Sequence, residues 1–139
     1  MKAEDVVKIA ETICKPCYYD RKAKLNEQLS AEAPDQAALV QEITTATYAD
    51  TVANGANAGY RVSVAFVTAV RRLDTAGNNE DAMDWATTSC ERMLNRLSDS
   101  GLFRRITNAS GRKVEENEYT LGVIGWEVTF TLQPIAYNC

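Results

Sequence analysis

The residues that most suggest chemistry are two cysteines in the motif Cys14-Lys15-Pro16-Cys17. A Cys-x-x-Cys pair of this kind is typical of thioredoxin-like thiol oxidoreductases. Such an enzyme needs a thiolate of low pKa, which a helix N-terminus favours. The residues before Cys14 have helical periodicity, so the sequence instead predicts that this thiol lies at a helix C-terminus, the wrong end of the dipole. Thiol redox catalysis is therefore kept only as an alternative hypothesis.

The other residues of the chain give little support to a metal site or to general base catalysis. The chain has no histidine, the commonest general base and metal ligand. A closed zinc site needs four ligands, usually in two close pairs, but Cys90 and Cys139 lie far apart in the sequence. Cys90 also falls on the apolar stripe of a predicted helix, as expected of a core residue. We expect no metal and no cofactor.

Acidic residues gather at two places, and neither place favours catalysis. Glu80 and Asp84 lie in the first turn of a predicted helix, where carboxylates complement the helix dipole. Glu115, Glu116 and Glu118 lie in a segment predicted to be exposed. A catalytic carboxyl needs desolvation or a close charge to shift its pKa, and neither place offers one. The chain is therefore predicted not to be an enzyme.

Length and charge narrow the function classes further. The length of 139 residues fits one domain spanning 1–139. The chain has 15 basic and 19 acidic side chains, and its net charge of −4 disfavours a nucleic-acid binder that works by bulk positive charge. The basic pairs Arg71-Arg72 and Arg104-Arg105 are interpreted as solvated charges, with a protein interface left open. No apolar run fits a signal peptide or a membrane span, so we expect the protein to stay where it is made.

Apolar periodicity predicts the elements that must position these residues. Helical spacing over about 3–14 predicts a short amphipathic helix, and a second helix of about five turns is predicted between an Asn78 N-cap and a Gly101 C-cap. Alternation over 60–72 gives the clearest strand, paired in a hairpin with a strand at 37–52 across a loop at 53–59. Two further strands are predicted at 102–106 and 119–132, with turn chemistry at 108–111 between them.

These elements predict an α+β fold in the order α-β-β-α-β-β. A single, mostly antiparallel four-stranded sheet with two helices on one face would bury every apolar stripe. The polar segment 15–36 is expected to be irregular, and residues 134–139 are expected to form a C-terminal tail.

Three segments in this order resemble the tail terminator family of tailed phages, represented by lambda-type minor tail protein U. They are the alternating strand at 60–67 (Tyr-Arg-Val-Ser-Val-Ala-Phe-Val), the helix start at 79–85 (Asn-Glu-Asp-Ala-Met-Asp-Trp) and the closing strand at 126–132 (Trp-Glu-Val-Thr-Phe-Thr-Leu). The resemblance covers the chain from about residue 37 onward. It rests on element order, length and pattern.

The resemblance implies a structural virion protein rather than an enzyme. Members of this family form hexameric rings that cap the tail tube, stop its elongation and join it to the neck and head. It further implies contacts with the tail tube protein and with neck or connector proteins, DNA passing through the lumen without specific binding, assembly in the host bacterial cytoplasm and a final place at the tail–neck junction. A head-completion or other neck protein is the alternative within this class.

Subunit contacts in such a ring are expected on the hairpin. An exposed hairpin can reach a neighbour, because its edge can add to another sheet. We expect contacts on the loop 50–59, the outer strand 37–48 and the polar face of the strand 60–72. The candidate interface residues are Tyr48, Asp50, Asn54, Asn57, Tyr60, Arg61, Arg71 and Arg72.

Overall fold

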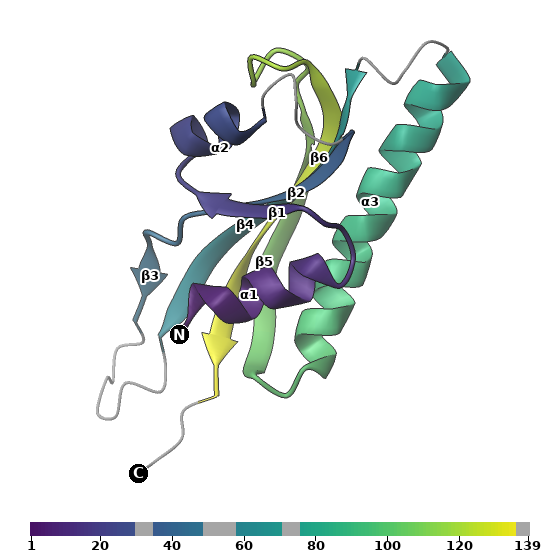
Figure 1. Ribbon diagram of the computed structural model, residues 1–139. Helices are drawn as coiled ribbons and strands as arrows, with labels where there is room; N and C mark the ends of the chain where they lie inside the picture. Colours follow the sequence, from purple (N-terminus) through teal and green to yellow (C-terminus); the bar gives the residue numbers. More distant parts are fainter. Residues whose placement is uncertain (30–34, 49–57, 71–75, 136–139) are drawn as a thin grey trace.

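The computed structural model describes residues 1–29, 35–48, 58–70 and 76–135 (Figure 1). Within these ranges three helices accompany one six-stranded sheet. The helices are α1 (Ala3–Glu11), α2 (Lys22–Gln28) and α3 (Ala76–Asp99). The strands are β1 (Cys17–Asp20), β2 (Gln36–Gln41), β3 (Ala46–Thr47), β4 (Gly59–Ala69), β5 (Phe103–Val114) and β6 (Val123–Pro134).

The sheet is built around the long strands β4 and β6. Its order is β1-β2-β4-β6-β5, and β3 pairs with the start of β4, beside the stretch that pairs with β2. All the pairs are antiparallel except β1 with β2, which is parallel. The register between the two long strands places Val64 opposite Val128 and Tyr60 opposite Leu132. β4 and β6 thus form the centre of the sheet.

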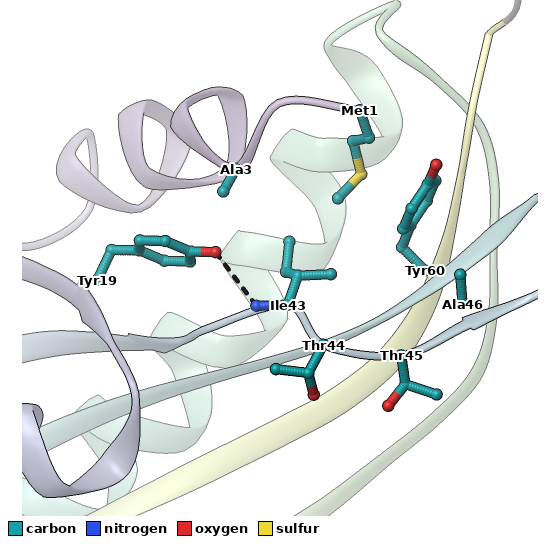
Figure 2. Close-up of a pocket in the computed structure, with 8 residues that line it drawn as sticks. All are labelled: Met1, Ala3, Tyr19, Ile43, Thr44, Thr45, Ala46 and Tyr60. Atoms are coloured by element: carbon teal, nitrogen blue, oxygen red, sulfur yellow. Dashed lines mark hydrogen bonds between the residues drawn. The ribbon is translucent and has the colours of Figure 1, made fainter.

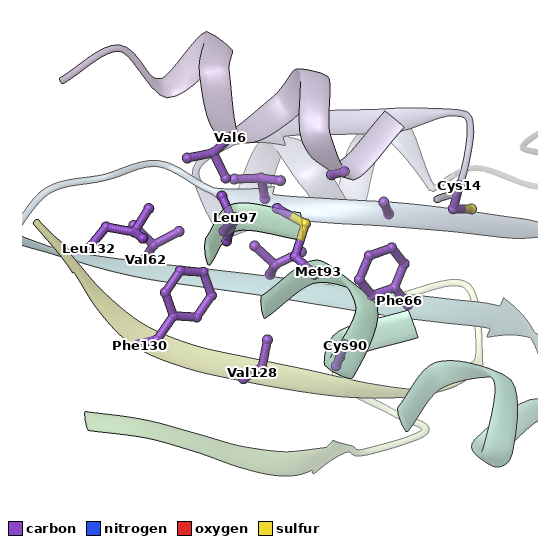
Figure 3. Close-up of a cluster of buried hydrophobic side chains, with 14 of the residues drawn as sticks. Val6, Cys14, Val62, Phe66, Cys90, Met93, Leu97, Val128, Phe130 and Leu132 are labelled. Atoms are coloured by element: carbon purple, nitrogen blue, oxygen red, sulfur yellow. The ribbon is translucent and has the colours of Figure 1, made fainter. Parts of the chain in front are cut away.

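One face of the sheet is covered by α1 and α3, which bury the larger core (Figure 3). Val62, Val64 and Phe66 of β4 point into this core because side chains of a strand alternate between its two faces. Phe66 also meets Trp85 of α3 edge to face, with ring centroids 6.1 Å apart. The fully buried side chains of the two helices are Val6, Ala10, Ala86, Met93 and Leu97.

The opposite face carries a second, smaller core beneath α2 and the segment 115–122. Ala65 and Val67 of β4 point to this side, and Leu25 and Leu29 from α2 and its C-cap pack here. Ala37 and Leu39 of β2 belong to the same cluster, and Val114, Tyr119 and Val123 join it from β5, β6 and the connection between them. The far half of β4 is therefore buried on both faces.

The α+β class is confirmed, and the two predicted helices do share one face. The count of four strands in the order α-β-β-α-β-β is wrong, because the segment 15–36 is not irregular: it contains β1 and α2 and runs into β2. A strand of 4 residues and a helix of 7 residues are too short to show a clear period in the sequence. The predicted strand at 37–52 holds the two short strands β2 and β3, with residues beyond 48 outside the described part.

The turn predicted at 108–111 is an irregularity inside β5. Thr107 pairs with Thr131 and Ser110 with Thr129, so two residues on β5 face one on β6, as in a β-bulge. Asn108 has a φ of +54°, a left-handed conformation that asparagine tolerates better than most residues. Turn-forming residues thus bend a strand here without ending it.

Both ends of the long helix were predicted approximately. α3 begins at Ala76, so Asn78 lies inside the helix and is not its N-cap. Gly101 has a φ of +77°, the left-handed conformation expected of a glycine that follows a helix. The predicted C-terminal tail begins where β6 ends at Pro134; Ile135 donates a backbone hydrogen bond to Leu102, and residues 136–139 lie outside the described part.

Gly125 of β6 lies against the backbone of β4, and this contact yields a stability prediction. A Cβ atom at Gly125 would lie 2.3 Å from the carbonyl oxygen of Phe66 and 2.8 Å from Cγ1 of Val67. We expect Gly125→Ala to lower the free energy of unfolding by about 1–3 kcal/mol, because the central strands must separate. Gly122→Ala is the control, since its nearest contacts are ordinary at 3.6 Å. Urea denaturation followed by circular dichroism measures both, and equal effects would contradict the prediction.

Candidate functional site

A hollow beside the start of α1 contains one of the predicted interface residues (Figure 2). Its volume is about 270 Å³, and no charged side chain is among the residues that line it. The Ile43 amide donates to the Tyr19 hydroxyl at 3.2 Å, which holds the link between β2 and β3 against the body of the protein. The lining of the hollow is mixed, because Thr44, Thr45 and Tyr19 contribute polar groups beside the apolar side chains. Its lining residues are Met1, Ala3, Tyr19, Ile43, Thr44, Thr45, Ala46 and Tyr60.

Three of the predicted interface residues are described by the structure, and they lie near one end of the sheet. Tyr60 is half-buried in the wall of the hollow. Tyr48 follows β3 and has 59% of its surface exposed. Arg61 lies on the opposite face from Tyr60, because neighbouring residues of a strand alternate. The other five candidates lie outside the described residues: Asp50, Asn54, Asn57, Arg71 and Arg72. Of the loop expected at 50–59, only residues 58 and 59 are described.

Arg61 is occupied by contacts within the chain. Its Nη1 donates to the carbonyl oxygen of Asn108 at 3.0 Å and to Oγ1 of Thr131 at 3.3 Å. On the same face, the hydroxyls of Ser63 and Thr129 are hydrogen-bonded at 3.0 Å. Arg61 therefore ties β4 across β6 to the bulge of β5. Its predicted contact with a partner stays a prediction.

The expected outer strand at 37–48 is only partly at an edge. β2 lies between β1 and β4, so its backbone is paired on both sides. β3, at Ala46–Thr47, pairs with β4 alone among the described strands. The part of this segment suited to a neighbour is therefore β3 together with Tyr48.

A network of buried and half-buried charges is the feature that the sequence analysis missed. Glu127 of β6 is only 7% exposed, and its carboxylate accepts from Nε of Arg112 at 3.1 Å and from Nε2 of Gln41 at 2.9 Å. The same guanidinium holds Glu118 through two hydrogen bonds of 2.6 and 3.0 Å, and Lys22 reaches Glu118 at 3.2 Å. In the sequence, Glu127 alternates like a solvent-facing residue, and Gln41 is 86 positions away.

This network fastens α2 and the segment 115–122 over the second core. Asn26 and Thr120 add a reciprocal pair: the Thr120 amide donates to Oδ1 of Asn26 at 2.7 Å, and Nδ2 of Asn26 donates to the Thr120 hydroxyl at 3.1 Å. Hydrogen bonds lower the pKa of Glu118 to about 2. The largest contribution comes from Arg112, and smaller ones come from the Glu115 amide and Lys22. The prediction that Glu118 is an exposed carboxylate is therefore wrong, whereas Glu115 and Glu116 are exposed as expected. Both carboxylates are paired with Arg112, and Lys22 adds a second cation at Glu118 while the Gln41 amide adds a hydrogen bond at Glu127.

Burial raises the pKa of each of the three cysteines that the structure describes. Cys14 follows the C-terminal end of α1, as the sequence predicted, and burial raises its pKa. Burial, with Glu11 and Cys14 nearby, raises the pKa of Cys17 to about 12. Cys90 lies in the larger core, and its thiol contacts the Trp126 carbonyl at 3.4 Å. At neutral pH all three are protonated thiols, whereas a nucleophilic cysteine must be a thiolate.

In the described part of the chain, no group of three or more His, Cys, Asp or Glu side chains is arranged to hold a metal ion. None of the helices in the described ranges is long and apolar enough to cross a membrane.

The Glu118 network gives a pH-dependent stability prediction. We expect Glu118→Gln to lower the free energy of unfolding by about 1–2 kcal/mol at neutral pH, since it removes a charge-assisted pair whose guanidinium is half exposed. Because the folded pKa is depressed below 4.5, this stability is present above that pH and lost as pH falls towards about 2. The wild type and the variant should therefore converge in acid. Glu27→Gln, which breaks the exposed pair with Lys24, is the control and should change stability by less than about 0.5 kcal/mol; equal losses in the two variants would contradict the prediction.

The buried thiols give a prediction about reactivity. In a Cys139→Ser variant, we expect Ellman's reagent at neutral pH to react slowly with Cys14, Cys17 and Cys90, and rapidly after unfolding in urea. The reason is that Cys14 and Cys90 are buried and Cys17 is half-buried, and that burial raises the pKa of all three thiols. Rapid reaction of Cys14 or Cys17 in the folded protein, together with reduction of insulin disulfides, would instead support the oxidoreductase hypothesis.

Comparison with known proteins finds no family model that matches the chain and no significantly similar curated protein. The function is therefore argued from the fold and its surfaces.

Proposed function

We propose that this protein is a structural component of a phage tail, of the tail terminator kind, which forms a ring on the last ring of the tail tube and stops its elongation. The proposal rests on the resemblance of three segments, at 60–67, 79–85 and 126–132, to that family. The observation that supports it is where these segments lie in the fold.

Two of the three segments pair at the centre of the sheet, and the third contacts them from the start of α3. Residues 60–67 lie in β4 and residues 126–132 in β6, and the two strands pair along their length. Residues 79–85 lie in α3, which packs on both strands. Phe66 and Trp85 meet in this contact. The resemblance therefore concerns the scaffold itself, a hairpin, a long helix and a second hairpin, which would fix where loops and edges are presented.

The proposed partners follow from this role. Copies of the chain associate into a ring, which we expect to be hexameric, between the tail tube and the neck or connector proteins of the virion. DNA passes through the lumen without specific binding, and the net charge of −4 suits this passage because an acidic wall repels phosphates. A head-completion or other neck protein has the same chemistry but contacts the filled head.

The experiment that tests the proposal is a tube-elongation assay. Tail tube protein is polymerised with and without the purified chain, and tube lengths and ends are measured by negative-stain electron microscopy. We expect shorter tubes, each with a ring of added density at one end. As a control, the chain is mixed with filled heads that lack tails.

Each result of this assay distinguishes the hypotheses. Binding to the heads, with tube length unchanged, would favour the head-completion alternative over a terminator. Binding to neither particle would contradict a place at the tail–neck junction.

A further inference from the structure

A second hollow lies between α3 and β5, at the border of the larger core. Its volume is about 280 Å³, and the residues that line it all belong to the described part of the chain. Cys90 and Val128 are buried in its wall (Figure 3), and Leu94 and Trp126 are half-buried beside them. A mainly apolar hollow of this size is at the small end of the range for ligand sites in proteins.

The indole of Trp126 is accessible in this hollow because a neighbouring residue of β5 is a glycine. A Cβ atom at Gly111 would clash with Nε1 of the indole and would lie 2.9 Å from Cε2, so the ring occupies the space that a side chain would take. No side chain at this position of β5 therefore covers the ring. Within the described ranges the cation–π contact is that of Lys22 with Tyr119, so no cation of the chain is placed over Trp126.

Glu91 is the one charged residue in the lining of this hollow. Its side chain is exposed, and among the described residues nothing forms an ion pair or a hydrogen bond with its carboxylate. Other polar groups of the lining are used within the chain. The Thr87 hydroxyl donates to a carbonyl of α3 at 3.1 Å, and the Cys90 thiol donates to the Trp126 carbonyl at 3.4 Å. The hollow thus combines an unpaired carboxylate with an aromatic ring.

The charges of α3 are divided between two sides of the helix. Asp84 lies seven residues before Glu91, and therefore on the same side of the helix, towards β5. Arg96 donates to Thr12 after α1, and Arg92 precedes Arg96 by about one turn, so both cations lie towards α1. The side of α3 that borders the hollow is therefore acidic.

β5 carries two cations near the hollow, and they differ in their availability. Arg112 is held on the opposite face of the sheet by its two hydrogen bonds to Glu118. Lys113 lies opposite Trp126 in the register of β5 and β6 and is exposed. Lys113 is thus the charge that opposes binding of a cation, and its removal provides a test.

A guanidinium group matches these features better than an ammonium ion does. It is planar, it stacks on aromatic rings, and it binds a carboxylate through two parallel N–H donors. The alkyl stem of an arginine side chain lies readily along apolar surface, such as that of Leu94. An arginine side chain therefore complements the carboxylate, the ring and the apolar wall together.

We propose that this hollow binds an arginine side chain of a partner protein. The guanidinium group pairs with Glu91 and lies against Trp126, and the stem lies along Leu94. This contact goes beyond the proposed role in a phage tail and does not depend on it, because it requires only an exposed arginine on the partner.

The two tryptophans of the chain provide the readout. Trp126 lines the hollow, whereas Trp85 packs edge to face on Phe66. In a ¹⁵N-labelled chain each indole N–H gives one NMR signal, and a Trp85→Phe variant assigns the two. We expect Nα-acetylarginine amide to move the Trp126 signal in a saturable way and to leave the Trp85 signal in place.

Matched ligands and variants isolate the charge. Nα-acetylcitrulline amide has nearly the same shape without the positive charge, and Glu91→Gln removes the carboxylate. We expect either change to weaken binding roughly three- to tenfold. Glu80→Gln is the control, because it removes the same charge at an exposed position near the start of α3, outside the hollow. Lys113→Gln should instead strengthen binding roughly twofold, since it removes the opposing charge. Circular dichroism verifies that each variant is folded.

Several results would overturn the proposal. They are a Trp126 signal that does not move, equal binding of the arginine and citrulline amides, and equal losses in the Glu91→Gln and Glu80→Gln variants. Binding of Nα-acetyllysine amide as tightly as the arginine amide would also overturn it, because the site would then accept any cation. The tube-elongation assay is independent of these titrations, so the proposed function and this contact succeed or fail separately.

Discussion

The burial of the second half of β4 on both faces is the constraint on which the rest of the structure depends. A strand that carries Phe66 on one side and Ala65 and Val67 on the other has no face left for water. Helices must therefore cover one face, and some other part of the chain must cover the other. α1 and α3 provide the first cover, whereas α2 and the segment 115–122 provide the second. Removal of either cover would expose apolar area on the central strand, at a cost of roughly 25 cal/mol for each Å².

The second cover is held differently from the first. The α1–α3 face relies mainly on large apolar side chains, and Arg96 of α3 also donates to the carbonyl and to the hydroxyl of Thr12, after α1, at 2.9 and 2.5 Å. The α2 face has the smaller apolar cluster, and charges supply much of its fastening through Glu118, Arg112 and Lys22. A short helix such as α2 has little stability of its own in water. Its position thus depends on groups that are distant in the sequence.

The sequence predicted those parts of the fold whose signals are local and long. β4, β6 and α3 show an apolar period over many residues, and each was found, although Asn78 was misplaced as an N-cap. β1 and α2 were missed because they extend over only 4 and 7 residues. In addition, Leu25 and Leu29 are buried by packing against the sheet, which local spacing does not indicate. The candidate site was predicted less well. Of the predicted residues, Tyr60 lines the hollow, whereas Met1, Tyr19 and Ile43 join it through tertiary contacts that no spacing reveals.

The bulge at Asn108 has a consequence for the free chain as well. Exposed edge strands are the sites at which sheet proteins grow into fibres, since an ordered row of amides invites another strand. β5 is 12 residues long and would be such a template if it were regular. Its two register shifts divide it into short stretches. The longest regular stretch that β5 offers to another strand is therefore much shorter than its 12 residues, which makes this edge a poor template for fibre growth.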